Sequence, residues 1–410
     1  MSIIFYVFAT IIGIIIFFKT DTCYYPLSFF FIKYVAGNII DFERVRNQVV
    51  FQLMVITLIF IVVIIKNKGK VAVKDFFFYK IIFLILAFLV FNSLLGMIDG
   101  HSLFQILIDS YKYLEIIVFY FLFRICWKNN QELLKGIKGL SIFMLCVGII
   151  EIFTTNRGGV GLNLIMSLMP MALLLSINNY INGYKLIFAV SLLVVVTCQT
   201  RTYIIGFALG LLFLIGNLSY EKRNKILKYV SVIFIVLFFM ISFFNVDLFS
   251  NTISRFLELS DGFSESGGYR IDEYAIALKK FIESPIFGNG FGYLKHMNIP
   301  KMGWMDWGDF IHCIYIEILF KTGLFGFINI VVIFGSFTKK ILQQAIFYKN
   351  KNKFIFSICF GGICSFISWL FTYAFAPLTT YGSMFVGVII SSIALSNYYI
   401  EQRKEIKRSE

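Results

Sequence analysis

Charged residues are scarce in this sequence. Only 15% of the 410 residues are Asp, Glu, Lys or Arg, whereas soluble domains average about a quarter. Long apolar runs recur along the whole chain, and the mean hydropathy is +0.82. The composition therefore excludes a soluble protein with one anchor and predicts an all-α polytopic membrane protein. The short alternating segments that are typical of membrane β-barrels are absent.

Metal-binding and redox motifs are also missing. The seven cysteines are scattered without metal or redox spacing, and most lie inside apolar runs, where cysteine is usually a small hydrophobe. We therefore expect no metal and no cofactor. The first apolar run, IIFYVFATIIGIIIFF, lacks a basic n-region and a small-residue cleavage site. It is interpreted as a retained first helix and not as a signal peptide.

The apolar runs predict about twelve membrane spans. These cover residues 2–18, 49–65, 76–95, 104–126, 139–153, 162–177, 185–199, 202–217, 227–245, 311–335, 354–372 and 379–399. The predicted organisation is spans one to nine in 1–245, a large loop in 246–310, spans ten to twelve in 311–399 and a basic tail in 400–410.

The distribution of Lys and Arg predicts the orientation. The segments rich in Lys and Arg are 66–74, 128–138, 220–228, 339–353 and 403–408. With twelve spans they all lie on one side, together with both termini, and the positive-inside rule makes that side cytoplasmic. The net charge of +14 is thereby explained without nucleic acid. The large loop between spans nine and ten then faces the exterior.

The large loop contains a predicted amphipathic helix. Segment 270–283 has apolar residues at helical spacing, which fits a helix lying near the membrane surface. Pro285 closes this segment, and GNGFG (288–292) predicts a tight turn.

All three histidines, and most arginines outside the basic loops, map to the exterior side. Nucleotide sugars are unavailable there, so an activated sugar substrate must arrive attached to a lipid, and a polyprenyl pyrophosphate is the obvious carrier. Arginine binds phosphate oxygens through its planar donor fork, and it stabilises the charge of a departing pyrophosphate. Histidine can orient or deprotonate an acceptor hydroxyl.

Three stretches resemble, in the same order, motifs of the O-antigen polymerase (Wzy-type) and O-antigen ligase superfamily. They are QTRTYIIGFALG (199–210), GYRIDEYAIALKKFIESPIFGNGFGY (268–293) and HCIYIEILFKTGLFGFI (312–328). NRGGVGLNLIMSLMPMALLL (156–175) is weakly similar to a further segment. The resemblance covers the C-terminal two-thirds of the chain. It implies a GT-C-like membrane glycosyltransferase that uses neither a metal nor a nucleotide sugar.

The resemblance also implies roles for individual residues. Arg201 and Arg270 match the arginines that bind the donor pyrophosphate, and His312 matches the essential histidine that serves the acceptor. Tyr315 and Glu317 fall on supporting positions. Tyr269 and Gly290 are further supporting residues of the second motif. Cys313 stands where the family often has Asn, which puts an acceptor contact by that amide in doubt.

Several other residues keep two interpretations. Arg157 is a candidate for a further contact with the pyrophosphate or with a sugar, and Arg270 has a solvated loop charge as its alternative. Asp306, Asp309 and Trp304 either contact the acceptor sugar or belong to a loop at the membrane interface.

Two further groups of polar residues also have alternatives. The row Asp109, Lys112 and Glu115 lies along one helix face and predicts a compensated salt-bridge stripe, with a proton relay as the alternative. His101 and His296 are expected to be structural or solvent-exposed.

The sequence thus predicts an O-antigen or surface polysaccharide polymerase. The enzyme would transfer a growing glycan from undecaprenyl pyrophosphate to a lipid-linked repeat unit, with inversion, on the outer face of the bacterial cytoplasmic (inner) membrane. Its expected partners are the undecaprenyl-pyrophosphate-linked oligosaccharide, membrane lipids and a chain-length regulator protein, without nucleic acid. An O-antigen ligase acting on lipid A–core is the alternative. A lipid-linked oligosaccharide flippase is the alternative from another class.

Overall fold

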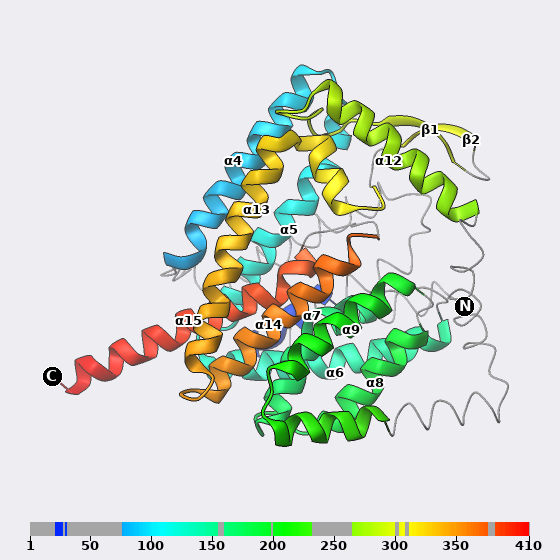
Figure 1. The fold of residues 1–410 in the computed structure, drawn as a ribbon. Coiled ribbons are helices and arrows are strands. Elements are labelled where there is room, and N and C mark those ends of the chain that lie inside the picture. Colours follow the sequence, from blue (N-terminus) through cyan, green and yellow to red (C-terminus); the bar gives the residue numbers. More distant parts are fainter. Residues whose placement is uncertain are drawn as a thin grey trace, which may run out of the picture.

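The protein is largely helical in the computed structural model (Figure 1). The structure describes residues 21–27, 29–30, 76–154, 160–197, 200–231, 265–299, 303–307, 311–375 and 382–409. The predicted spans 2–18 and 49–65 lie outside these residues, as does most of 227–245. Arg157 and Asp309 also lie outside them.

Among the described residues, five helices are long and apolar enough to cross a membrane. They are α4 (Phe76–Ile98), α6 (Asn130–Thr154), α13 (Ile314–Tyr348), α14 (Lys353–Thr372) and α15 (Gly382–Ser409). Shorter apolar helices are α7 (Val160–Ile177), α8 (Tyr184–Thr197) and α9 (Arg201–Gly216). Helix α5 (Leu103–Cys126) occupies the predicted span 104–126 and carries four charged residues. These helices support a polytopic membrane protein, and the number of twelve spans stays a prediction.

Helix α14 lies at the centre of the bundle. It packs against α7, α9, α13 and α15, and most of its side chains are buried. Small residues allow the close approach: a Cβ added at Gly361 would lie 2.7 Å from the Met171 N, and one at Gly362 would lie 2.8 Å from the Gly387 C. Small residues at helix contacts are typical of membrane bundles, where backbones must approach closely.

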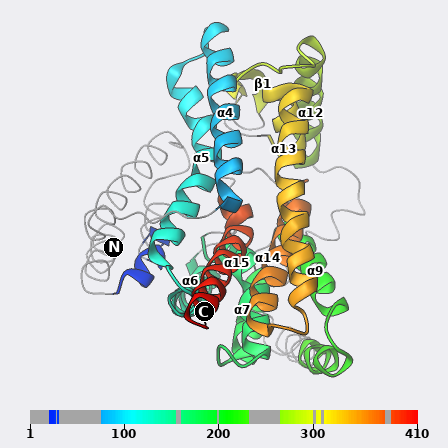
Figure 2. The same ribbon diagram turned by 90° about the vertical axis from the view of Figure 1, so that its left-hand side faces the viewer.

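A second layer stands above this bundle. Helices α4, α5 and α13 rise in the same direction beyond it (Figure 2). Helix α12 (Glu265–Glu283) lies against the upper part of α13 and beside strand β1 (Lys295–Ile299). The short 3-10 helix η1 (Thr22–Tyr24) contacts α5 and α6 lower down.

The all-α expectation requires one correction. Strand β1 pairs antiparallel with β2 (Gly303–Trp307), so a two-stranded sheet lies within the segment 246–310. The register places His296 opposite Asp306, and Asn298 opposite Trp304. Each strand has only five residues, KHMNI and GWMDW, which is too short for a period-2 pattern to distinguish a strand from a loop.

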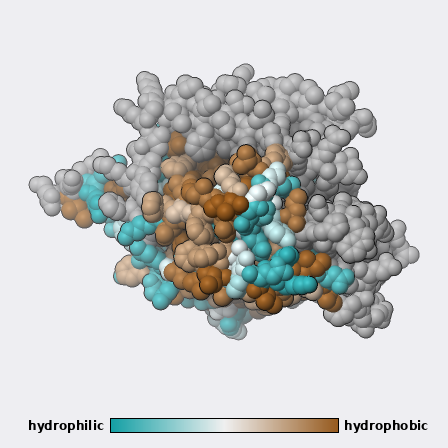
Figure 3. Space-filling model, turned by 90° about the horizontal axis from the view of Figure 1, so that it is seen from above, coloured by the Kyte–Doolittle hydropathy of each residue, from teal (hydrophilic) through white to brown (hydrophobic). Residues whose placement is uncertain are grey.

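Helix α12 includes the segment 270–283 for which a helix is predicted, and it has two contrasting stripes. The apolar stripe is exposed: Ile271, Leu278 and Ile282 are 40–72% exposed. The stripe that faces the protein contains the buried Glu273 and Ala277. Seen from this end of the molecule, hydrophobic and hydrophilic side chains are interleaved over the described surface (Figure 3). An outward apolar stripe beside charged residues fits a helix that lies in a membrane interface.

The turn after α12 docks into a kink of α13. Gly323 interrupts α13 with φ 64°, which frees the next backbone N–H groups. Pro285 and Ile286 accept hydrogen bonds from Leu324 N and Phe325 N at 2.9 and 3.0 Å. A Cβ at Gly323 would lie 2.5 Å from the N of Gly288, so only glycine fits both the dihedral angle and the space.

We expect Gly323→Ala to destabilise the protein by about 1–3 kcal/mol, because a non-glycine residue at this φ is strained. Thermal unfolding of the purified protein in detergent measures the effect. The matched control is Gly335→Ala in the same helix, where an added Cβ meets no atom within 4 Å. Equal stabilities of the two variants would show that the kink does not depend on Gly323.

Candidate functional site

Two helix starts meet at the C-terminal end of α14. Ile314 N, at the start of α13, donates to Tyr373 O at 3.0 Å, and Tyr315 Oη donates to Leu370 O at 2.9 Å. At the start of α9, Thr202 O accepts a hydrogen bond from Thr372 Oγ1 at 3.4 Å. Consequently the residues that precede or begin these helices lie at one end of the bundle.

Arg201 and His312 occupy these two starts. Arg201 is the first residue of α9 and is half-buried. His312 comes two residues before α13, and Cys313 is the N-cap of that helix. The N-terminus of a helix carries partial positive charge and exposed N–H groups, which favours anions. The place is thus electrostatically suited to a phosphate group.

Helix α12 holds His312 with two adjacent residues. Glu273 Oε2 lies 2.9 Å from the Nδ1 of His312 and accepts from its backbone N at 3.1 Å. Tyr274 Oη donates to the carbonyl of His312 at 3.0 Å. A small apolar cluster of Ala277, Ile311 and Phe320 fastens the same faces of α12 and α13. The imidazole is therefore fixed to α12 as well as to its own helix.

Arg270 lies one turn before Glu273 on the same helix. This spacing places its side chain on the face of α12 that meets His312. Its Nε is buried and has no hydrogen-bond partner within the described part of the chain. A buried guanidinium N–H without a partner is costly, and an anion bound there would satisfy it.

The start of α7 lies beside α9. Tyr203 Oη donates to Asn163 Oδ1 at 3.3 Å, and the buried Glu151 accepts from Leu162 N at 3.1 Å. A carboxylate at a helix N-terminus is a favourable cap. These contacts bring the first turn of α7 to the same end of the bundle as Arg201.

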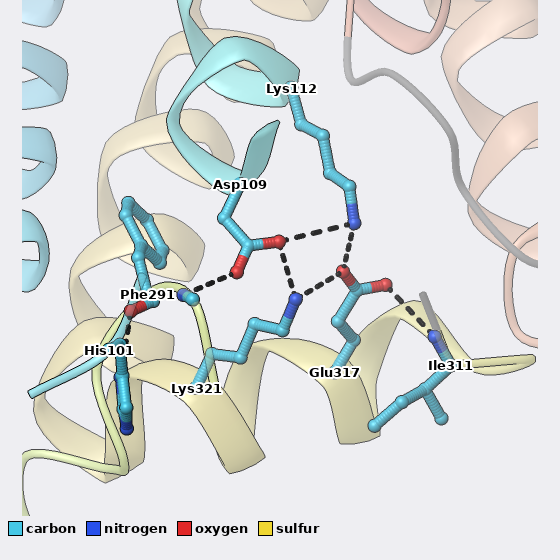
Figure 4. Close-up of polar contacts among 8 residues, drawn as sticks. His101, Asp109, Lys112, Phe291, Ile311, Glu317 and Lys321 are labelled. Atoms are coloured by element: carbon cyan, nitrogen blue, oxygen red, sulfur yellow. Dashed lines mark hydrogen bonds and ion pairs between the residues drawn. The ribbon is translucent and has the colours of Figure 1, made fainter. Parts of the chain in front are cut away.

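Four buried charges lie together between α5 and α13 (Figure 4). Lys321 Nζ donates to Asp109 Oδ1 at 2.5 Å, and Lys112 Nζ donates to Glu317 Oε1 at 2.6 Å. The diagonal pairs Lys112–Asp109 and Lys321–Glu317 are each 3.6 Å apart. We call Asp109, Lys112, Glu317 and Lys321 the charge cluster. It holds two positive and two negative groups, all at most 5% exposed.

The charge cluster also holds two backbone segments. The second oxygen of Asp109 accepts from Gly292 N at 2.8 Å, and that of Glu317 accepts from Ile311 N at 3.4 Å. Gly292 ends the GNGFG turn, and Ile311 directly precedes His312. The cluster therefore anchors the turn after α12 and the residue before the histidine.

The remaining predicted residues lie in different places. Tyr315 contacts α14 and Glu317 joins the charge cluster. Gly290 has φ 74° and fits against the backbone of Gly96 in α4. Trp304 and Asp306 lie on β2, and Tyr269 lies on α12.

His101 contacts the GNGFG turn. Its Nδ1 lies 3.0 Å from Phe291 O, and its ring meets Tyr293 edge-on. His296 lies on β1. The contacts of His101 are thus with the turn that anchors α12.

Sequence reasoning missed Glu273, Tyr274 and Lys321. One signal for Glu273 was present, because a carboxylate three residues after Arg270 must share its helix face. Lys321 stands four residues after Glu317, which predicts an ion pair along α13 but not its partners on α5.

Comparison with known proteins supports the resemblance. A family model described as O-antigen ligase matches residues 186–331, and no curated protein matches the chain. The matched segment contains α8, α9, α12 and the first part of α13, and with them Arg201, Arg270, Glu273 and His312. The resemblance to the O-antigen polymerase and ligase superfamily is thereby confirmed for this segment. At this coarse level the match supports a bacterial membrane enzyme of polysaccharide assembly.

We expect Asp109→Leu to destabilise the protein by roughly 3–5 kcal/mol, because it leaves an uncompensated buried positive charge. The double variant Asp109→Leu/Lys321→Met restores neutrality and should recover most of that loss. Thermal unfolding in detergent compares the two variants.

A control is Glu221→Leu, which breaks the exposed Lys225–Glu221 pair at 3.2 Å. Exposed pairs contribute little, so its stability should equal that of the wild type. A double variant that is no more stable than Asp109→Leu would show that charge balance is not what the cluster supplies.

Proposed function

We propose that this protein is a membrane glycosyltransferase that polymerises surface polysaccharide on the outer face of the bacterial cytoplasmic membrane. The donor is a growing glycan on undecaprenyl pyrophosphate, and the acceptor is a lipid-linked repeat unit. One observation supports this most. Helix α12 carries Arg270 and Glu273 on one face, and Glu273 contacts His312. Pyrophosphate release and acceptor activation need such a cation and such a base side by side.

In the proposed reaction, Arg201 and Arg270 bind the donor pyrophosphate. Guanidinium groups bind phosphate oxygens bidentately, and the helix start at Arg201 adds partial positive charge. The unsatisfied Nε of Arg270 is a donor for one of those oxygens. Arg157 is proposed as a further contact, three residues before α7 begins.

His312 takes the proton of the acceptor hydroxyl. The hydroxyl oxygen attacks the anomeric carbon while the bond from that carbon to the pyrophosphate oxygen breaks. The pyrophosphate leaves with the bonding electron pair and is stabilised by the two arginines. Attack from the face opposite the leaving group inverts the anomeric configuration.

The acceptor distinguishes two candidate functions. Phe accounts for 50 of the 410 residues, which fits A/T-biased coding, and A/T-biased chains are common among the polymerases that this sequence resembles. The description of the matching family as O-antigen ligase favours the second candidate, transfer to lipid A–core.

The test is reconstitution in liposomes with lipid-linked repeat units. We expect longer glycans on the same lipid. Transfer to added lipid A–core without lengthening would instead support the ligase. Movement of the lipid-linked substrate across the bilayer without a new glycosidic bond would contradict the proposal that the protein is an enzyme.

Variants test the assigned residues in the same assay. We expect Arg201→Ala, Arg270→Ala and His312→Ala to lose at least about 10²-fold in rate, since removal of one oxyanion-stabilising donor or general base has that size of effect. Arg270→Lys should keep part of the activity, because the charge remains and the bidentate geometry does not.

The control is Arg223→Ala, which removes an arginine placed over Tyr220 near the far end of α9. It should keep wild-type activity. If the alanine variant of Arg201, Arg270 or His312 keeps near wild-type activity, that residue does not have its proposed role.

A further inference from the structure

We infer that Glu273 is a positioning residue that fixes one tautomer of His312, with the proton on Nδ1 and the lone pair on Nε2. The structural part of this inference stands on geometry alone. Its consequence for catalysis rests on the proposed function.

The hydrogen bonds at one oxygen atom determine the tautomer. Glu273 Oε2 lies 3.1 Å from the backbone N of His312 and 2.9 Å from its Nδ1. A backbone N–H can only donate, so Oε2 is an acceptor in the first contact. The second contact is a hydrogen bond to the same acceptor when Nδ1 carries the proton. Nε2 is then unprotonated in the neutral ring.

Burial strengthens this interaction. The side chain of Glu273 is 0% exposed, whereas that of His312 is 12% exposed. The carboxylate is therefore withdrawn from water, and its interaction with the ring is weakly screened. His312 keeps a small exposed portion through which a substrate hydroxyl can reach the ring.

The backbone of His312 is held on both sides. Glu273 binds its N–H, and Tyr274 Oη binds its carbonyl at 3.0 Å. Both groups come from adjacent residues of α12, so they fix the backbone of His312 against this helix. Rotation of the ring away from Glu273 would break the buried contact between Nδ1 and Oε2. The helix thus sets the orientation as well as the tautomer of the imidazole.

This arrangement has a specific consequence for the proposed reaction. In this tautomer the lone pair is on Nε2, and Nε2 accepts the proton of the acceptor hydroxyl. The imidazolium that forms then faces a buried carboxylate, which stabilises it, as the aspartate does in serine-protease triads. One helix face would thus present a cation to the leaving group through Arg270 and an anion to the base through Glu273.

The tautomer can be measured directly in the full-length protein. The chain has only three histidines, so ¹⁵N-histidine labelling yields three pairs of ring nitrogen signals. The variant His312→Asn assigns one pair. We expect the wild type to show Nδ1–H and an unprotonated Nε2 at His312 when the ring is neutral. We expect Glu273→Gln to keep this tautomer, since the amide oxygen still accepts, and Glu273→Leu to lose it.

Two results of this measurement would overturn the inference. One is an Nε2–H tautomer at His312 in the wild type. The other is an unchanged Nδ1–H tautomer in Glu273→Leu that is folded by thermal unfolding in detergent. Both are independent of enzymatic activity, so they test the inference even where the proposed function fails.

Kinetics in liposomes test the catalytic part. We expect Glu273→Gln to lower kcat by about 10- to 10²-fold, the lower end of what a general base contributes, with the KM for the lipid-linked donor unchanged. The matched control is Asp272→Asn, which changes the exposed neighbouring carboxylate on α12. A purely structural Glu273 predicts wild-type kcat in Glu273→Gln, and that result would overturn its role in catalysis.

Discussion

The buried charge cluster between α5 and α13 is the constraint on which the upper half of the molecule depends. Two lysines and two carboxylates are taken out of water together, and each is acceptable only while the others stay within contact distance. This requirement fixes α5 and α13 against each other without a large apolar interface. The two carboxylate oxygens that remain bind the N–H groups of Gly292 and Ile311. The cluster therefore places the turn that follows α12 and the residue that precedes His312.

The position of α12 follows from these anchors. Its C-terminal turn is held at Gly292 and in the kink at Gly323, and its inner face meets His312 through Glu273. Because the polar stripe with Arg270 and Glu273 points inward, the apolar stripe with Ile271 and Ile282 is left outside. That distribution would be unfavourable for a helix surrounded by water. It is favourable for a helix at a membrane surface, where the outer stripe meets lipid.

Much of this arrangement was predictable from local sequence patterns. The apolar runs located α4, α9 and α14, and the start of α9 at Arg201 agrees with a span ending near Gln199. The turn at GNGFG was readable from its glycines. The sheet of β1 and β2 was missed because its strands have only five residues each and mix polar with apolar side chains.

Contacts between distant segments were not predictable in the same way. The stripe of Asp109, Lys112 and Glu115 was expected to compensate itself along one helix. In the structure Asp109 contacts Lys321, and Lys112 contacts Glu317, more than 200 positions away. No periodicity within α5 encodes such partners. Glu273 was overlooked for a similar reason, since a carboxylate in an exterior loop usually is a solvated charge.

The segment similar to O-antigen ligases does not form the candidate site by itself. Residues 186–331 supply Arg201, Arg270 and His312, but some of the groups that hold their helices come from outside this range. Helix α5 contributes half of the charge cluster, and the end of α14 receives the starts of both α9 and α13. The candidate catalytic residues thus lie in one segment, while their placement also depends on α5 and α14. Substitutions far from residues 186–331 can therefore alter the site, and those that reach it through α14 need not change any charge.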